Sequence, residues 1–158
     1  MSPRSVLFLT LLAMTTTTGC VGQCLDEDGI VPGVGVSEAG ASLCLDEPWP
    51  TVDKRLGAPA TTSDLQGAGV RLTWSEPALV GYVTSQDEVG TVSGLQLSAG
   101  VTALTAGGVG LGSDDAAVRA EFGDPLLDPL LGGWLYLSDG IGFQWDGGAV
   151  SAIHLFVP

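Results

Sequence analysis

The sequence predicts an α+β fold made of two tandem repeats, each a short helix followed by an antiparallel β-meander. Three observations support this prediction. A helix with a defined stop occurs at residues 51–59 and again at 117–125, a constant offset of 66. Runs of alternating apolar residues separated by turn residues follow each helix. Both copies end alike, in residues 92–97 and 150–155. We expect the helices to pack on one face of a continuous or adjoining antiparallel sheet.

Each helix carries residues that define its apolar side and its end. Two apolar residues four positions apart share one helical face. A glycine then permits a left-handed helix end, and a proline two positions later prevents the helix from resuming. In the second copy Ser113 is expected to cap the helix, with Asp114 and Asp115 at its positive end. The matching residues are Val52 and Val118, Leu56 and Phe122, Gly57 and Gly123, and Pro59 and Pro125.

The strands are predicted from alternation and from the turns between them. The first repeat, residues 33–98, has a weak strand around 34–36 and strands at 69–75, 79–85 and 91–97. The second repeat, residues 99–158, is strand-like at 101–106, has a connection at 126–131, and has strands at 134–138, 141–145 and 149–156. Asp139-Gly140 and Asp146-Gly147 are hairpin turn signals.

The charge of the chain excludes one class of function. It has 18 acidic and 5 basic residues among 158, a formal net charge of −13. Nucleic-acid binding needs clustered Lys and Arg to neutralise phosphates, so it is not expected. Solubility outside a cell is the simplest interpretation of this acidity.

The N-terminus is typical of an export signal. Residues 1–19 combine Arg4 with an apolar core at 6–14, which is too short to span a bilayer. The small-residue run that ends in Gly19-Cys20 resembles the lipobox of bacterial lipoproteins. That resemblance implies a lipid on Cys20, residues 20–32 as a tether, and, with Val21 following, sorting to the outer membrane. A secreted or periplasmic product is the alternative.

Three cysteines leave one pair once Cys20 is assigned to a lipid. An oxidising compartment favours a disulfide between Cys24 and Cys44. No metal site is predicted, because the chain has one histidine and no Cys-x-x-Cys. Asp26 to Gly29 faintly suggests a calcium loop but lacks the full twelve-residue pattern, so it is interpreted as an acidic turn. No cofactor is predicted.

The second repeat carries a motif with known relatives. The helix stop and the turn before it are similar to the repeats of beta-lactamase inhibitory protein and to the domain of the outer-membrane lipoprotein BamE (SmpA). The resemblance implies helices on one face of an antiparallel sheet, with the other face free to bind protein, and it transfers no target. It is carried by Gly110, Leu111, Gly112, Ser113, Val118, Phe122, Gly123 and Pro125.

Alternation along the strands divides the predicted sheet into two faces. The face toward the helices is expected to carry Leu72, Trp74, Val80, Tyr82, Leu95, Leu97, Leu135, Leu137, Ile141, Phe143, Ile153 and Leu155. The opposite face is expected to bind a partner, because Trp, Tyr and Arg dominate protein interfaces. The alternative is that the tether, a loop or a second copy of the chain covers this face. Its predicted partner-binding residues are Arg71, Gln96, Trp134, Tyr136, Gln144, His154 and Phe156, joined by Thr73.

The predicted function is therefore a lipid-anchored, non-enzymatic envelope protein that binds another protein or acts as a scaffold. No catalytic residues are assigned: His154 is the only histidine and lies in the middle of a strand. An exported inhibitor of a hydrolase, using the aromatic sheet face, is the alternative. A structural role in an outer-membrane assembly also stays open, and the sequence names no partner.

Overall fold

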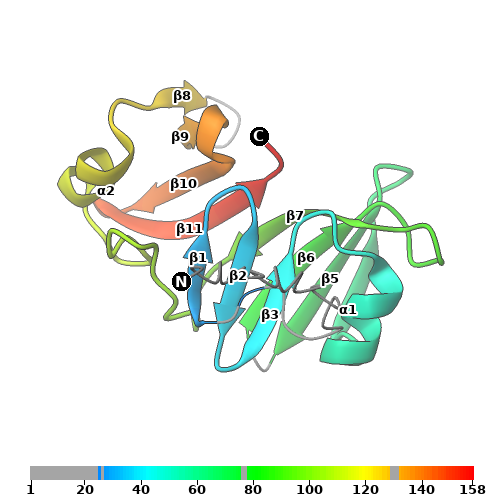
Figure 1. Cartoon of the computed structure of the whole chain (residues 1–158). Coiled ribbons are helices and arrows are strands. Elements are labelled where there is room, and N and C mark those ends of the chain that lie inside the picture. Colours follow the sequence, from blue (N-terminus) through cyan, green and yellow to red (C-terminus); the bar gives the residue numbers. More distant parts are fainter. Residues whose placement is uncertain (1–24, 26, 76–77, 129–131) are drawn as a thin grey trace, which may run out of the picture.

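A computed structural model describes residue 25 and residues 27–75, 78–128 and 132–158. These residues fold as an α+β structure with two sheets and two short α-helices (Figure 1). The first sheet is a small antiparallel meander near the N-terminus. It consists of β1 (Gly29–Val31), β2 (Gly35–Glu38) and β3 (Ala41–Cys44), in that order.

The second sheet has eight antiparallel strands in the order β4-β5-β6-β7-β11-β10-β9-β8. Helix α1 (Trp49–Leu56) precedes β4 and helix α2 (Asp115–Phe122) precedes β8. A 3₁₀ turn, η1 (Leu137–Asp139), lies between β9 and β10. The strands are β4 (Thr61–Asp64), β5 (Val70–Ser75), β6 (Ala78–Val83), β7 (Val92–Leu97), β8 (Leu126–Asp128), β9 (Gly133–Tyr136), β10 (Ile141–Asp146) and β11 (Ala149–Phe156).

This strand order joins two four-stranded meanders at their last strands. We call α1 with β4–β7 the N-terminal half, and α2 with β8–β11 the C-terminal half. The halves meet where β7 pairs with β11, with Gln96 opposite His154. The predicted continuous antiparallel sheet is therefore confirmed, and its two edges are β4 and β8.

One face of the large sheet holds the core. Val52 of α1 and Val118 of α2 are fully buried in one cluster with residues of β5–β7 and β9–β11. The three-stranded sheet packs on the same face, since Leu43 lies over Gly81 of β6. Figure 1 shows β2, β3 and α1 in front of the strands of the N-terminal half. We call this side of the large sheet the core face.

Both helices end as predicted, but one begins differently. Gly57 and Gly123 follow the helices with φ of 71° and 81°, and each N–H donates to a carbonyl of the preceding turn. The cap of α2 is Asp114, whose carboxylate accepts from the Ala117 N–H at 2.8 Å. Ser113 was the wrong residue, because its hydroxyl instead accepts from the Gly110 N–H.

The strand predictions need correction at four places. Residues 101–106 form no strand but an irregular connection, in which the Leu104 carbonyl accepts from the Ile30 N–H of β1. The predicted connection at 126–131 begins with the edge strand β8. Strand β4 was not predicted, because all four of its residues are polar and exposed. Residues 29–31, at the end of the predicted tether, form β1.

The predicted signal peptide, Cys20 and Cys24 lie outside the described residues. Cys44 is disulfide-bonded. Its pairing with Cys24 stays a prediction, because Cys24 is not among the described residues. Within the described part of the chain, no helix is long and apolar enough to cross a membrane.

Candidate functional site

The face of the large sheet that points away from the helices is the candidate site. Val80 and Ala152 belong to this face. Although each is at most 6% exposed, neither is part of the core cluster, whereas their chain neighbours Leu79 and Ile153 are. Among the described residues, the helices and the three-stranded sheet all pack on the core face. We call the opposite side the open face.

A straight row of side chains crosses the open face from one edge of the sheet to the other. Each member is the direct cross-strand neighbour of the next, so the row contains one residue from every strand. Gln96 and His154 stand at its centre, where the two halves join. From β4 to β8 this central row is Thr61, Thr73, Val80, Gln96, His154, Gly142, Leu135 and Leu126.

A second row runs beside it on the N-terminal half. Arg71 pairs with Tyr82, Tyr82 with Gly94, and Gly94 with Phe156. Gly94 has no side chain, and the Tyr82 side chain lies beside it: a Cβ at Gly94 would be 3.7 Å from Tyr82 Cδ2. On the C-terminal half the corresponding positions hold Gln144 and the small Ala152.

Five of the seven predicted partner-binding residues lie on the open face: Arg71, Gln96, Gln144, His154 and Phe156. Trp134 and Tyr136 were placed on the wrong face. Trp134 pairs with Phe143 and Tyr136 with Ile141, both core residues. The Tyr136 side chain is buried, its ring packs 5.3 Å from Phe122, and its hydroxyl donates to the Gly123 carbonyl at 3.1 Å. Burial raises the pKa of Tyr136.

The prediction also missed Val80, Tyr82 and Leu135, which lie on the open face rather than in the core. The strands β6 and β9 are apolar at nearly every position, so alternation alone does not assign their faces. Gly81 holds the core position of β6 that an apolar side chain would otherwise have marked. One signal in the sequence could have corrected this. If the two repeats are aligned so that Trp74 matches Tyr136, both rings are placed on the core face.

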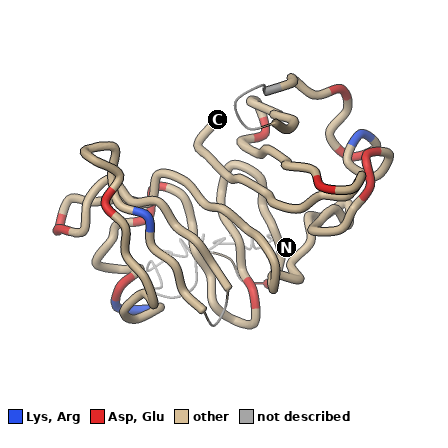
Figure 2. The backbone as a smooth tube through the Cα atoms, turned by 180° about the vertical axis from the view of Figure 1, so that it is seen from behind, with Lys and Arg blue, Asp and Glu red and all other residues tan. Residues whose placement is uncertain are grey.

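The open face is nearly free of acidic groups. The strands β5, β6, β7, β9 and β11 contain none of the 18 acidic residues, and β10 contains only its terminal Asp146. Figure 2 shows the acidic residues mainly on loops and at the margins of the sheet. A chain with a net charge of −13 thus keeps the middle of this face neutral.

Arg71 is the cation of this face. Two other arginines are engaged elsewhere: Arg55 pairs with Glu47, and Arg119 pairs with Asp115 and Asp124. Within the described ranges, the half-buried Arg71 has no ion-pair partner. Its guanidinium is therefore available to an external anion.

Polar atoms at the centre of the face are partly unsatisfied. The Tyr82 hydroxyl donates to the Gln96 amide oxygen at 2.8 Å. By contrast, Thr73 Oγ1 and His154 Nε2 are inaccessible and have no hydrogen-bond partner among the described residues. Burial lowers the pKa of His154, which favours a neutral imidazole at pH 7. Buried polar atoms of this kind are costly to leave unpaired.

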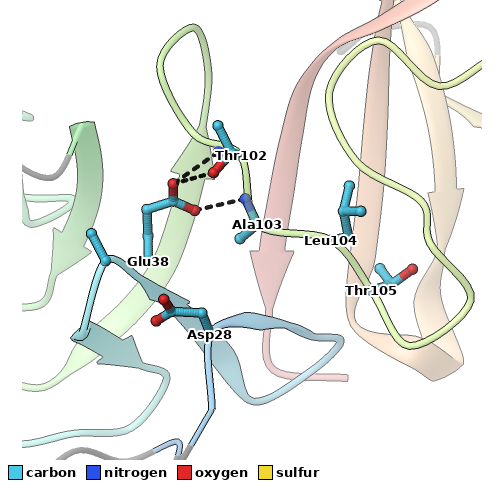
Figure 3. A pocket seen from close by; sticks show the side chains of 7 residues that line it. Asp28, Glu38, Thr102, Ala103, Leu104 and Thr105 are labelled. Atoms are coloured by element: carbon cyan, nitrogen blue, oxygen red, sulfur yellow. Dashed lines mark hydrogen bonds between the residues drawn. The ribbon is translucent and has the colours of Figure 1, made fainter.

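A pocket of about 490 Å³ lies away from this face, between the three-stranded sheet and residues 102–105 (Figure 3). Its two carboxylates already have structural partners. Glu38 accepts from the Thr102 hydroxyl and from the N–H groups of Thr102 and Ala103. Asp28 accepts from the Ser37 hydroxyl and the Gly40 N–H, and these bonds lower its pKa. The hydrogen bonds of Glu38 therefore link the three-stranded sheet to residues 102–105, which belong to the connection between the halves.

The open face presents one guanidinium, one neutral imidazole, amides and aromatic rings. In the described part of the chain, no cluster of three or more His, Cys, Asp or Glu residues is arranged to hold a metal ion. Comparison with family models, curated proteins and solved structures finds no match to this chain.

Proposed function

We propose that this chain is a lipid-anchored, non-enzymatic module of the cell envelope that binds another protein through the open face. The observation that carries the proposal is the open face itself, a sheet surface with side chains from eight strands and almost no carboxylates. Aromatic rings, amides and an unpaired arginine are typical of protein interfaces. The core face, by contrast, packs against the two helices and the small sheet.

We also propose that the two halves are copies of one unit. Their cross-strand registers support this. Trp74 pairs with Leu79 in one half as Tyr136 pairs with Ile141 in the other. Each half has a register shift before its last strand, after Tyr82 and after Gln144. The pairing of β7 with β11 then places Gln96 and His154, which match each other, at the centre of a two-fold relation.

The hydrogen bonds around the helix starts repeat as well. In each half, the chain before the helix pairs with the beginning of the last strand. The Asp46 N–H donates to the Val92 carbonyl at 2.8 Å, and the Gly112 N–H donates to the Val150 carbonyl at 2.8 Å. The helix ends are held alike too, because Trp74 Nε1–H and the Tyr136 hydroxyl donate to the carbonyls of Gly57 and Gly123.

The anchor in this proposal comes from the sequence around Cys20. Intact mass and membrane fractionation of the protein from its host, beside a Cys20→Ser variant, test it. We expect a mass increase that matches lipidation, and loss of both the increase and the membrane association in the variant. A soluble, unmodified wild-type protein would remove the anchor and favour the exported inhibitor.

Binding through the open face is tested with a photo-cross-linking amino acid placed at Gln96. The matched control is the same amino acid at Lys54, an exposed residue of α1 on the other side of the sheet. We expect a discrete protein adduct in living cells from position 96 and not from position 54. Equal adducts from both positions, or none from position 96, would count against the proposal. A one-to-one adduct with a hydrolase would identify the inhibitor alternative.

A further inference from the structure

The open face has two chemically different ends. On the N-terminal half, the unpaired Arg71 lies beside Tyr82. Toward the opposite edge, Leu135 and Phe156 lie around Gly142: a Cβ there would be 2.8 Å from Leu135 Cδ2 and 3.9 Å from Phe156 Cε1. Leu126, beside Leu135 on the edge strand β8, is 59% exposed. We call Leu126, Leu135 and Phe156 the apolar end.

We propose that the partner is a protein segment that presents a carboxylate to Arg71 and an apolar side chain to the apolar end. This inference rests on the proposed function and specifies the chemistry of the partner. Charge complementarity favours it, because Arg71 has no ion-pair partner among the described residues, and the one acidic residue of the two neighbouring strands, Asp64 of β4, pairs with Val70 rather than with Arg71. A guanidinium binds a carboxylate with two parallel hydrogen bonds, which gives orientation as well as attraction.

The spacing of the two ends requires a polypeptide. Strands lie about 4.8 Å apart, so the three steps from β5 to β11 place Phe156 about 14 Å from Arg71. The five steps from β5 to β9 place Leu135 about 24 Å away. An extended chain advances about 3.3 Å per residue, so a segment of about four to seven residues spans this distance. A small anion reaches only one end.

The middle of the face offers a polar group to the main chain of such a segment. Gln96 is half-buried and lies on β7, between the strands of the two ends, and its amide oxygen already accepts from the Tyr82 hydroxyl at 2.8 Å. Its amide N–H groups can donate to a backbone carbonyl of a crossing segment. A second copy docked face to face is disfavoured, because two chains with a net charge of −13 repel each other.

The test selects binders from a displayed library of random twelve-residue peptides, with the full-length protein purified in detergent as the target. Arg71→Glu is compared with the wild type, and Lys54→Glu on α1 is the matched control with the same change in net charge. We expect wild-type binders to be enriched in Asp or Glu four to seven residues from a large apolar residue. Their affinity should fall about tenfold in Arg71→Glu, which itself should select Lys or Arg.

Three outcomes separate this inference from the proposed function. Binders that switch from acidic to basic in Arg71→Glu but not in Lys54→Glu support both. Binders that Gln96→Arg abolishes, but whose acidic content does not depend on Arg71, overturn this inference and leave the proposed function intact. If no peptides are enriched, or if Gln96→Arg leaves the affinity of the binders unchanged, both this inference and the proposed function fail.

Discussion

The two halves of the molecule have matching strand registers, but different side chains fill the core face of the sheet in each half. When Trp74 is matched with Tyr136, Gly81 of β6 falls on Phe143 of β10. In the N-terminal half, Leu43 of the small sheet lies over Gly81. In the C-terminal half, the Phe143 ring takes that place and packs against Phe122 and Tyr136.

This difference explains why β3 of the three-stranded sheet lies over the N-terminal half, while only the turn at Gly33 approaches the C-terminal half, near Gly140. A glycine in β6 leaves room for an element that comes from outside the half, whereas a phenylalanine in β10 lets the half complete its own core. One scaffold thus accepts two ways of filling a core, provided that the total volume is conserved. Substitutions at the matched positions test this comparison.

The largest effect is expected from Phe143→Ala. The Phe143 side chain is 1% exposed and contacts two other rings, so truncation leaves a cavity that no neighbouring element can fill. We expect a loss of about 3–5 kcal/mol in the free energy of unfolding, measured by urea denaturation. Val157→Ala, at an exposed position, is the control and should change stability little. A loss below about 1 kcal/mol at Phe143 would show that the C-terminal half does not depend on its own aromatic core.

The matched substitution, Gly81→Ala, adds volume instead of removing it. Its Cβ would lie 3.2 Å from Leu43 Cδ2 and 3.3 Å from Trp74 Cζ3. The Trp74 ring is held by its hydrogen bond to the Gly57 carbonyl, so Leu43 must move. We expect a loss of about 1–3 kcal/mol in the same measurement.

Adding Leu43→Val to Gly81→Ala sharpens this test, since it removes a methylene at the point of contact. The double variant should lose less stability than the sum of the two single changes, because the substitutions share one contact. Additive losses would mean that Leu43 is not the element that fills the space above Gly81.

The sequence predicted the parts of the fold that depend on local signals. The stops at Gly57 and Gly123 were readable because a left-handed residue followed by proline leaves few alternatives. The matching ends of β7 and β11 were readable from their alternation. The separate N-terminal sheet was not, because its packing depends on Gly81, and an absent side chain predicts no particular neighbour.

The candidate site was predictable only where one face of a strand is polar. Arg71, Gln96 and His154 alternate with apolar residues, so their side of the sheet was clear. Trp134, Leu135 and Tyr136 are all large and apolar, so their alternation carries no information on which ring turns inward. Pairing across β9 and β10 decided it, and that pairing is a tertiary property.

A moderate effect is expected from Tyr136→Phe, which removes the hydroxyl that holds the end of α2. The Gly123 carbonyl then loses its 3.1 Å bond, whereas the ring packing is retained. We expect a loss of about 1 kcal/mol in urea denaturation. The N-terminal half provides the comparison, because the bond from Trp74 to Gly57 remains. An unchanged stability would show that the two helix ends are not held equivalently.

The smallest expected effect concerns pH and the junction between the halves, where His154 lies opposite Gln96. Burial lowers the pKa of His154 below 6.5 in the folded protein. The unfolded chain therefore binds more protons than the folded one as the pH falls below 6.5, and the folded state loses stability there. Above pH 6.5 both states are neutral at this residue, and the contribution is complete. Urea denaturation from pH 7.5 to 5.5 should show declining stability in the wild type and a flatter profile in His154→Gln. Because His154 is the only histidine, a decline that persists unchanged in the variant would place its origin in the carboxylates instead.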